Sequence, residues 1–416
     1  MNLAEELTAR GLVEHHSAPL DEIFSKPRTV YLGVDPSADS MQAGNLVVVL
    51  LMKRLAEAGN KIVLLVGGGT GMIGDPRESG ERQLADPKVV AKNAKAIRGQ
   101  MERIIGKRIT VVNNADWLLK VRLVDFLRDI GKHFTVNELV KRDIIKRRLE
   151  TPDESISYTE FAYSLLQRFD YLTLHKERGV DLQIGASDQW TNILSGVELI
   201  RRKANGAAYA FTCPLVTDAA GKKFGKSEGN AVWLDPKKTS PFQFYQFWLN
   251  QGDEMVEKYL KFYTFMSVAD IDALMAGHRA APGDREAQET LASQVTSLVH
   301  GPAAAAQAAA ATDALFGGRP FHELSRDELA VALAEAPAFS IPKRELAEGY
   351  PLATAIAEGG LAPSKSEARR LIEAKGITLS GFPVPNPEQK LFPNDLPGGY
   401  ALVRRGKRGV LVLFVK

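Results

Sequence analysis

The residues best suited to chemistry follow short apolar runs, at points where predicted strands give way to loops. The first run, residues 29–32, has the composition of a buried strand. Asp35-Pro36 ends this strand because proline has no amide hydrogen for a strand ladder. After a polar loop, Gly44-Asn45 opens an apolar run with helical character that continues to Ala58. A strand, a tight loop and a helix start form an anion-binding arrangement, since free amides at a helix N-terminus favour negative charge.

A glycine-rich loop, GGGTGMIGDP, follows the second apolar run, residues 61–66. Residues 69–74 match the dinucleotide pattern G-x-G-x-x-G, but the match alone is weak. Asp75-Pro76 also interrupts the helix that a dinucleotide site needs. We expect these glycines to let the backbone turn tightly or approach a ligand, with the Asp75 carboxylate in the same cleft as Tyr31.

A second loop, GKKFGKS, offers two ammonium groups and a hydroxyl, Lys223, Lys226 and Ser227. Mobile groups of this kind suit the stabilisation of charge on transferring phosphates. The spacing is too short for a P-loop. The alternative for this segment is a solvated basic turn.

Polar residues also recur at helical spacing in EFAYSLLQRFDYL. Intervals of four and three place Tyr163, Gln167 and Asp170 on one helix face. The alternative is the polar face of a half-buried helix, yet the surroundings are semi-apolar, where polar groups need partners. Asp188-Gln189-Trp190 follows the apolar run 182–185, again at the edge of a parallel sheet where ligands bind.

These motifs are positioned by alternating strand and helix patterns, which predict a parallel α/β sheet. We expect strands over 29–32, 61–66, 109–112, 182–185 and 211–216, and helices over 44–58, 87–104 and 188–203. Residues 1–27 indicate a short helix and a linker, and 117–169 and 240–317 are mostly helical in pattern. Residues 318–349 resemble a linker with one small helix, followed by a basic helix over 367–375 and short strands.

Composition limits the classes of function. The chain has 416 residues, enough for two or three domains, and a net charge of only +3. Residues 342–416 hold 12 Lys and Arg against 7 Asp and Glu, a net charge of +5, so the remaining residues sum to −2. A basic tail on a near-neutral body predicts a polyanion partner for the tail alone.

The single cysteine, Cys213, excludes a disulfide framework and a zinc knuckle, and the seven histidines show no metal-ligand spacing. The N-terminal segment lacks the apolar core of a signal peptide, and no apolar run is long enough to span a membrane. We therefore expect a soluble cytoplasmic protein without a dedicated protein metal site.

Taken together, the motifs resemble those of bacterial tyrosyl-tRNA synthetases, which are class I aminoacyl-tRNA synthetases. The matching segments are, in order, YLGVDPSADS, LVGGGTGMIGDP, DFLRDIGKHFTVN, TEFAYSLLQRFDYL, LQIGASDQWTNI, PLVTDAAGKKFGKS and LAPSKSEARRLIEAKGI. They cover nearly the whole chain, which makes the resemblance specific in a way that no single motif is.

The resemblance implies roles for individual residues. Tyr31 and Asp170 would hydrogen-bond the hydroxyl of substrate tyrosine, while Tyr163, Gln167 and Asp75 would hold its ammonium group and Gln189 would lie along its carboxylate side. The nucleotide would be approached by Gly33, Asp35, Gly44, Gly185, Asp188 and Lys226. Phenylalanine lacks the hydroxyl and would leave both polar groups without a hydrogen-bond partner, which explains selection of tyrosine over phenylalanine. Enzymes of this class are the standard example of such selectivity.

The implied reaction is tyrosine–tRNA ligation. The tyrosine carboxylate attacks the α-phosphate of ATP, whose magnesium ion is carried with the nucleotide, and tyrosyl-adenylate then acylates the 3′-terminal ribose of tRNA(Tyr). Catalysis would depend on positioning and on hydrogen-bond donors. The candidate donors are Gln42, Asn45, Lys223, Lys226 and Ser227.

One motif departs from the family pattern. The first signature of the class is usually H-I-G-H, and here it is Gln42-Ala43-Gly44-Asn45. Asn45 can donate through its amide, whereas Gln42 cannot become a cation. The departure keeps open a rival hypothesis, a catalytically weakened paralogue that binds structured RNA. Activation of another aromatic amino acid is a weaker alternative, because Asp170 opposite Tyr31 favours a hydroxyl.

The resemblance also implies an architecture. A Rossmann-like parallel-sheet catalytic domain over 1–235, with a helical dimerisation insertion at about 117–170, would precede an all-helical domain over 236–325 that binds the anticodon region. A linker over 326–349 would lead to a small α+β RNA-binding domain over 350–416. The expected RNA-binding residues are Lys365, Arg369, Arg370, Arg404 and Arg405. The resemblance further implies a homodimer.

Overall fold

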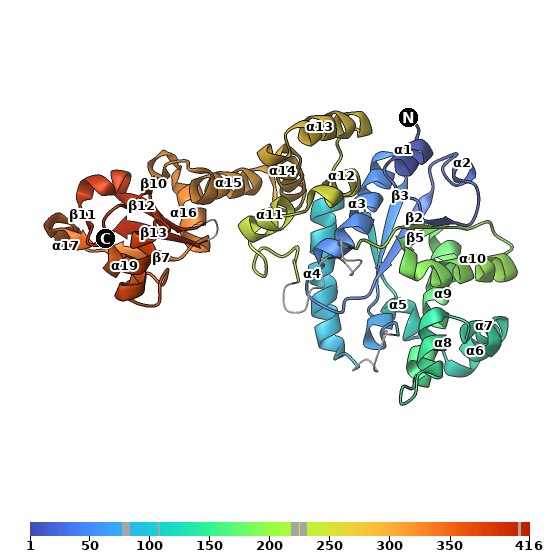
Figure 1. The fold of residues 1–416 in the computed structure, drawn as a ribbon. Coiled ribbons are helices and arrows are strands. Elements are labelled where there is room, and N and C mark those ends of the chain that lie inside the picture. The colour runs from blue at the N-terminus through green and yellow to red at the C-terminus, as the bar shows by residue number, and fades with distance from the viewer. Residues whose placement is uncertain (77–83, 107–108, 218–223, 225–230, 407–408) are drawn as a thin grey trace. The chain divides into compact units, whose positions relative to one another are not determined.

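The computed structural model describes residues 1–76, 84–106, 109–217, 224, 231–406 and 409–416 (Figure 1). The chain forms two compact units. The first contains residues 1–238 and 252–287, and the second contains residues 239–251 and 288–416. Among the described residues, no helix has both the length and the apolar character needed to cross a membrane.

The first unit is built on a six-stranded sheet with the order β1-β6-β5-β2-β3-β4. The strands are β1 (His15–His16), β2 (Thr29–Val34), β3 (Lys61–Val66), β4 (Ile109–Asn113), β5 (Leu182–Ala186) and β6 (Tyr209–Cys213). All neighbours pair in parallel except β1, which pairs antiparallel with β6. The parallel sheet expected from the apolar runs is therefore present, with β2 at its centre.

Two sequence expectations differ from the sheet that forms. The last parallel strand was expected over 211–216, but β6 ends at Cys213 because Pro214 has no amide hydrogen for the ladder. The N-terminal segment was expected to hold only a helix and a linker. It also contributes the edge strand β1, whose two residues are too few to show a periodic pattern.

Helices cover both faces of this sheet (Figure 1). One face packs on α9 (Tyr158–Arg178) and α10 (Trp190–Ala204), through a core that includes Tyr31, Val63 and Leu65. The other face is covered by α3 (Ala43–Glu57) and α4 (Pro87–Ile105). Because strand side chains alternate, buried residues on both faces make these strands continuous apolar runs, as expected of a parallel sheet.

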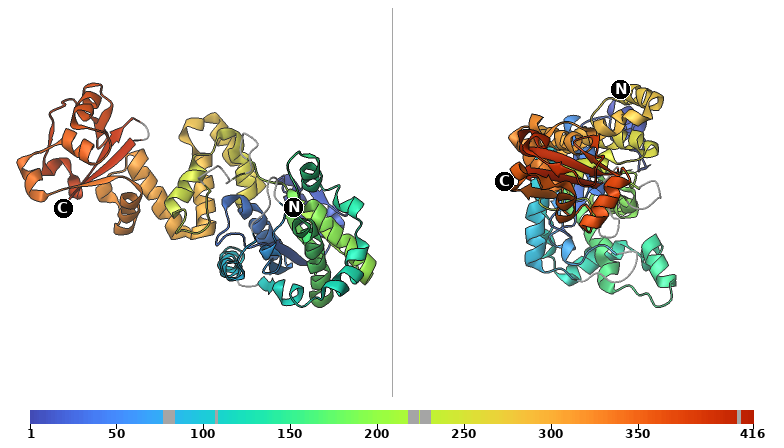
Figure 2. Two further views of the ribbon diagram at one scale, coloured as in Figure 1. Left: turned by 90° about the horizontal axis from the view of Figure 1, so that it is seen from below. Right: turned by 60° about the vertical axis from the view of Figure 1, so that its left-hand side comes forward.

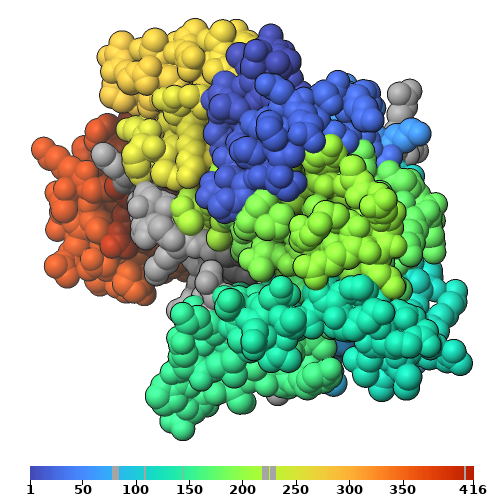
Figure 3. Space-filling view, turned by 90° about the vertical axis from the view of Figure 1, so that its right-hand side faces the viewer, coloured from blue at the N-terminus to red at the C-terminus, as the bar shows by residue number. Residues whose placement is uncertain are grey.

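The remaining helices of the first unit are short or lie outside the sheet layers. They are α1 (Leu3–Ala9), α2 (Leu20–Ile23), α5 (Ala115–Leu118), α6 (Leu123–Asp129), α7 (Val136–Leu139), α8 (Asp143–Glu150), α12 (Asp253–Tyr263) and α13 (Val268–Ala280). Of these, α5 to α8 lie between β4 and α9, within or next to the segment of about 117–170 for which a helical insertion was predicted, and they are called the insertion below. In the space-filling view this insertion, in teal, occupies one side of the first unit (Figure 3).

The second unit contains helices and a five-stranded sheet with the order β10-β9-β12-β13-β7 (Figure 2). Its strands are β7 (Ala338–Ile341), β9 (Ile377–Leu379), β10 (Phe382–Pro383), β12 (Tyr400–Arg405) and β13 (Gly409–Val415), and β8 (Tyr350–Pro351) pairs separately with β11 (Lys390–Leu391). The helices are α11 (Pro241–Leu249), α14 (Glu286–His300), α15 (Pro302–Thr312), α16 (Arg326–Glu335), α17 (Lys343–Glu348), α18 (Leu352–Glu358) and α19 (Lys365–Glu373).

Residues 326–349, expected as a linker, contain α16, β7 and α17. Strand β7 pairs in parallel with β13, with Leu413 opposite Phe339. Four residues carry too little periodicity to reveal a strand, and its partner lies more than seventy residues further along the chain. The basic helix expected over 367–375 is α19, which begins at Lys365 and is capped by the Ser364 side chain accepting from the Glu367 amide.

Candidate functional site

The candidate site lies where the central parallel strands end. Tyr31 is within β2, and Asp35 follows that strand directly. Gln189 ends the short 3₁₀ turn after β5, and Asn114 follows β4. The carboxyl ends of parallel strands share one edge, so polar residues after different strands meet there.

At one end of the site, the carboxyl of Asp170 is 1% exposed. It accepts hydrogen bonds from Asn114 Nδ2 at 2.9 Å and from Trp117 Nε1 at 2.8 Å. Burial raises the pKa of Asp170 to about 8, although both hydrogen bonds act in the opposite direction. Burial, and then the negative charge of Asp170, raises the pKa of the Tyr31 phenol well above its usual value. A carboxyl and a phenol, both predicted from the sequence, therefore share one buried region.

Asn114 and Trp117 are site residues that the sequence reading missed. Only their position in the sequence could have predicted them. Both follow the apolar run that forms β4, and so they lie at the edge of the sheet where ligands bind. Their partner, the Asp170 carboxylate, lies 56 and 53 residues away in the sequence. No local pattern could predict this contact.

A chain of hydrogen bonds continues from Asp170 to the residue after β2. Asn114 Nδ2 also donates to Thr70 Oγ1 at 2.8 Å, and Thr70 in turn donates to Asp35 Oδ1 at 2.7 Å. The Tyr163 hydroxyl donates to the other Asp35 oxygen at 2.8 Å. Tyr163 and Asp35, which were assigned to the tyrosine and nucleotide sides respectively, are thus direct partners.

The glycines of the GGGTG loop allow this network to form. A Cβ on Gly67 would overlap the Asp35 carboxylate, and one on Gly68 would overlap the Asn113 side-chain amide. The Gly69 amide donates to Asn114 Oδ1 at 2.7 Å. The glycines were predicted to let the backbone approach a ligand. In the structure they let it approach the side chains of Asp35, just after β2, and Asn113, the last residue of β4.

Two of the three predicted ammonium-binding residues, Gln167 and Asp75, form a second network with Gln189, which was predicted on the carboxylate side, whereas Tyr163 binds Asp35. Gln189 Nε2 donates to Asp75 Oδ2 at 3.2 Å, and Gln167 Nε2 donates to Gln189 Oε1 at 3.5 Å. Arg142, just before α8, adds a cation that the sequence reading did not anticipate, with Nη2 3.7 Å from Asp75 Oδ1. The structure thus brings together three side chains from separate segments. It also places the Arg142 guanidinium beside the Asp75 carboxylate, where it could compete with a cationic ligand.

The Gln42-Ala43-Gly44-Asn45 motif begins α3. The Gln42 amide donates to Asn45 Oδ1 at 3.1 Å, and the Ala43 amide donates to the Val232 carbonyl at 2.9 Å. Gln42 is half-buried and Asn45 is exposed. With its oxygen engaged, Asn45 offers its NH₂ group as the donor for a ligand.

The GKKFGKS loop contacts the Gln42-Ala43-Gly44-Asn45 motif through one described residue, Phe224. A Cβ on Gly44 would lie 2.6 Å from the carbonyl oxygen of Phe224, so any larger residue there would displace that backbone. Lys223, Lys226 and Ser227 lie outside the described residues.

Three further predicted nucleotide-side residues line the same edge. A Cβ on Gly33 would lie 3.3 Å from the Tyr31 hydroxyl, and one on Gly185 would lie 2.9 Å from Ile193 Cδ1. Asp188 lies in the 3₁₀ turn that ends at Gln189. Glycine at positions 33 and 185 therefore leaves room for the Tyr31 hydroxyl and for the Ile193 side chain.

The basic residues predicted to bind RNA are all in the second unit. On α19, Lys365, Arg369 and Arg370 are exposed and pair with Glu358, Glu388 and Glu367 at 3.4, 2.7 and 3.1 Å. On β12, Arg405 is exposed and donates to the Leu361 carbonyl at 3.2 Å. Arg404 is half-buried and donates to the Leu315 carbonyl at 2.7 Å, and burial lowers its pKa. Arg404 is thus engaged in the fold, whereas the α19 cations are on the surface.

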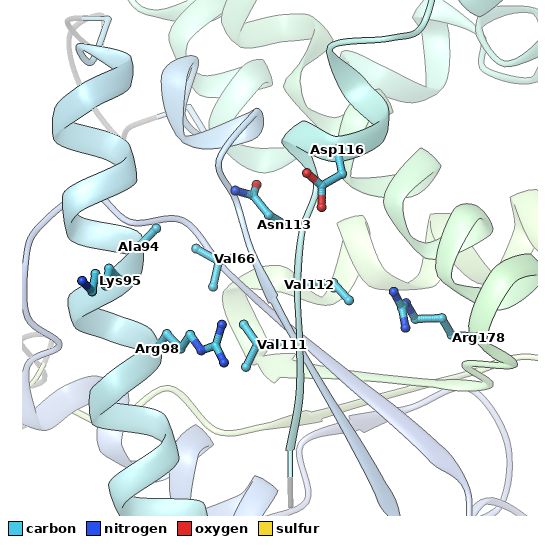
Figure 4. A pocket seen from close by; sticks show the side chains of 9 residues that line it. All are labelled: Val66, Ala94, Lys95, Arg98, Val111, Val112, Asn113, Asp116 and Arg178. Carbon is cyan, nitrogen blue, oxygen red and sulfur yellow. The ribbon is translucent and has the colours of Figure 1, made fainter. Parts of the chain in front are cut away.

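A cavity of about 370 Å³ lies beside β4 (Figure 4). Arg98 from α4 and Arg178 from the end of α9 line it together with Asp116. Its lining includes none of the residues predicted from the sequence for the site.

Comparison with known proteins matches nearly the whole chain. Residues 25–317 match the family "tRNA synthetases class I (W and Y)", and residues 328–413 match the "Tyrosine--tRNA ligase SYY-like C-terminal domain". The tyrosine–tRNA ligase of Anaeromyxobacter dehalogenans strain 2CP-1 is 43% identical, covering 100% of both chains, and that of Leifsonia xyli is 44% identical, covering 100% of this chain and 94% of its own. A C-terminally truncated mitochondrial tyrosyl-tRNA synthetase of Aspergillus nidulans matches with a TM-score of 0.68 and 30% identity, over 76% of this chain and 94% of its own.

Proposed function

The chain belongs to the class I tyrosine–tRNA ligases, and from this premise we propose how its residues divide the reaction. Enzymes of this class use ATP. The amino acid carboxylate attacks the α-phosphate of ATP, a carboxylate–phosphorus bond forms and pyrophosphate leaves. The terminal ribose hydroxyl of tRNA(Tyr) then attacks the adenylate carbonyl, and AMP leaves. The observation that carries the substrate assignment is the buried Asp170 carboxyl beside Tyr31.

Asp170 and Tyr31 bind the hydroxyl of the substrate tyrosine. Asn114 and Trp117 use both carboxyl oxygens of Asp170 as acceptors and so hold it in one orientation. Phenylalanine would leave this buried polar pair without a partner, and an unsatisfied buried polar group is costly. The pocket therefore selects a hydroxyl-bearing ring over the other aromatic amino acids.

The ammonium group of tyrosine binds Asp75, with Gln167 and Tyr163 beside it and Gln189 toward the carboxylate. In the structure Asp75 is 3.7 Å from Arg142, so an entering ammonium group competes with that guanidinium. Tyr163 also donates a hydrogen bond to Asp35. This contact supports a tyrosine site that lies next to the ATP site, with Tyr163 and Asp35 between them.

MgATP lies across the start of α3, with the magnesium ion carried by the phosphates. Gly33, Asp35, Gly44, Gly185 and Asp188 line the nucleotide path. Gln42 and Asn45 donate to the phosphates from the first turn of α3, where the helix dipole also favours negative charge. Lys223, Lys226 and Ser227 complete the donor set on the pyrophosphate side.

The tRNA contacts involve the second unit. Lys365, Arg369 and Arg370 are exposed on one helix, α19, and phosphate groups would compete with the carboxylates that pair with them. Arg405 extends this surface from β12. Arg404 supports it from within the fold through the Leu315 carbonyl.

A homodimer through the insertion is supported by its surface. Large apolar side chains there are between 44% and 74% exposed: Leu119, Leu123, Val124, Leu127, Val136 and Leu149. Exposed apolar side chains gathered on one segment are typical of an interaction surface. Light scattering that gives a mass near twice that of the chain would support this assignment, and a monomer would oppose it.

The deciding experiment is tyrosine-dependent exchange between ATP and pyrophosphate. Exchange should require tyrosine and should be negligible with phenylalanine. The altered first signature, Gln42 in place of histidine, favours one rival, an inactive RNA-binding paralogue. No exchange with any amino acid, together with intact binding of tRNA, would establish that rival instead.

A further inference from the structure

The loop between β2 and α3, residues 36–41, connects two parts of the proposed nucleotide path. Asp35 precedes the loop, and Gln42 follows it as the N-cap residue of α3. Helix α4 packs beside α3 (Figure 1). It carries two buried amide side chains, Asn93 and Gln100, which are 7% and 4% exposed. Buried amides need hydrogen-bond partners, and both side chains find theirs in this loop.

The two amides of α4 hold opposite ends of the loop. Asn93 Nδ2 donates to the Pro36 carbonyl at 3.0 Å. Gln100 Oε1 accepts a hydrogen bond from the Met41 amide at 2.9 Å, and its Nε2 donates to Ser40 Oγ at 2.8 Å. Two residues at this spacing lie on one face of a helix, roughly 10 Å apart along its axis. Helix α4 therefore sets the distance between the two ends of the loop.

The Ser40 hydroxyl extends this network to a third segment. It accepts hydrogen bonds from Gln100 Nε2 and, at 3.1 Å, from the Asp235 amide, and it donates to the Met41 carbonyl at 2.9 Å. A hydroxyl has one donor and two acceptor sites, so these three contacts use its full capacity. Ser40 thus joins α4 to residues 232–235.

The segment 232–235 lies antiparallel to the start of α3, with Gln42 opposite Trp233. On one side of Gln42, the Met41 carbonyl accepts a hydrogen bond from the Leu234 amide at 2.9 Å. On the other side, the next amide of α3 donates to a carbonyl of the same segment, also at 2.9 Å. The main chain is therefore held on both sides of Gln42, and the direction in which its side chain leaves α3 is fixed.

We infer that Gln100 is a positioning residue for the formation of tyrosyl-adenylate. It holds Ser40 and Met41 in the register that places Gln42 at the start of α3. Gln100 touches neither substrate and acts only through these residues. This role rests on the proposed function of Gln42 as a hydrogen-bond donor to the phosphates of ATP.

The test is Gln100→Leu, which keeps a side chain of similar size and removes both hydrogen bonds to the loop. Because a small misplacement of groups that position a substrate is costly, kcat/KM for ATP in ATP–pyrophosphate exchange should fall about tenfold. The KM for tyrosine should change less than about twofold, because Asp170 is held by Asn114 and Trp117. A role in folding alone would lower kcat with the folded fraction and leave the KM for ATP unchanged.

The matched control is Asn60→Leu, which also removes two hydrogen bonds of an amide side chain. Asn60 Oδ1 accepts from the Arg28 amide at 2.8 Å, and its Nδ2 donates to the Leu55 carbonyl at 2.8 Å. Asn60 lies just before β3, at the opposite end of the parallel strands from the site. Both variants should lose stability, but only Gln100→Leu should lose kcat/KM for ATP.

Amide hydrogen exchange provides a readout that does not require activity. Exchange reports local opening of the main chain, and without the Gln100 contacts residues 36–43 should exchange about tenfold faster. The same residues in Asn60→Leu should exchange as in the unchanged chain. Ser40→Ala removes the central hydroxyl without adding bulk. It should repeat both effects of Gln100→Leu, and it is the second variant if Gln100→Leu does not fold.

Four results would overturn the inference: an unchanged kcat/KM for ATP, an equal loss in Asn60→Leu, unchanged hydrogen exchange in residues 36–43, or a KM for tyrosine that rises as much as that for ATP. Failure of the proposed function has a different signature, because the unchanged chain itself would then lack tyrosine-dependent ATP–pyrophosphate exchange. The hydrogen-exchange comparison would still decide whether Gln100 holds the loop.

Discussion

At the scale of single residues, burial governs the chemistry of the site. The Asp170 carboxyl is buried and accepts two hydrogen bonds. Burial raises its pKa more than the two hydrogen bonds lower it, so that the pKa is about 8. A carboxyl in that state lowers the stability of the fold at neutral pH, because desolvation opposes its ionisation. A buried carboxyl that lowers the stability of the fold is expected where the side chain is needed to select a substrate.

Asp170→Asn should weaken tyrosine binding and remove the pH dependence that this carboxyl gives to stability, and its NH₂ group replaces one of the two oxygens that accept hydrogen bonds from Asn114 and Trp117. The pKa of Asp170 rises from its ordinary value of 3.8 to about 8 in the fold, so the wild type loses stability as pH rises through this interval and no further above it. The free energy of unfolding of the variant, relative to that of the wild type, should rise from pH 5 to pH 8, by at most about 1.4 kcal/mol per pH unit. Urea unfolding at pH 5, 6.5 and 8 measures this trend.

Asp39→Asn provides a contrast. The hydrogen bond from Lys238 lowers the pKa of Asp39, so the wild-type carboxylate contributes stability that is lost as pH falls through that lowered pKa. The Asp39 and Asp170 variants should differ from the wild type in opposite directions. A stability difference between Asp170→Asn and the wild type that does not change with pH would contradict the raised pKa of Asp170.

At the scale of elements, the insertion is joined to α9 by a buried ion pair. Arg148 Nη1 on α8 lies 3.0 and 3.1 Å from the two Glu160 carboxylate oxygens, and these residues are 1% and 2% exposed. Arg148 also donates to the Ser155 carbonyl in the intervening loop. The pair thus fixes the start of the helix that presents Tyr163, Gln167 and Asp170.

Arg148→Met should cost about 3–5 kcal/mol of stability, because it leaves a buried carboxylate unpaired. The double variant Arg148→Met, Glu160→Leu should recover much of that loss, since apolar residues of similar size can replace a buried pair. Thermal unfolding compares the three chains. A double variant as unstable as the single one would show that the loop, and not the charge, is what matters.

At the scale of the whole molecule, the second unit joins its terminal sheet to the helices before it. The Phe321 and Tyr400 rings stack with centroids 6.4 Å apart, and Arg404 binds the Leu315 carbonyl. Strand β7, before residue 350, belongs to the same sheet as β13. A division of the chain between adenylate formation and tRNA binding should therefore keep β7 with the terminal sheet. A cut before α16 does so, and it also removes the partners of Leu315 and Phe321.

Removal of residues 326–416 should leave ATP–pyrophosphate exchange within about twofold, because no group proposed for adenylate formation is lost. Charging of tRNA should fall about tenfold or more at 150 mM salt, since phosphate contacts dominate affinity for nucleic acid. A shorter truncation after Gly349 would leave β7 without its partner β13 and should aggregate. A folded 1–325 chain without exchange would contradict the division.

The sequence by itself determined the parallel sheet, its ligand-binding edge and the family. Continuous apolar runs are local patterns, and they suffice to predict β2, β3, β4 and β5. The roles of Tyr31 and Asp170 come from the resemblance of the motifs to the family and stay predictions. Only the tertiary structure decided which side chains complete the site. Asn114 and Trp117 reach Asp170, Phe224 meets Gly44, and β7 joins β13, because such contacts depend on packing between distant segments and leave no periodic trace in the chain.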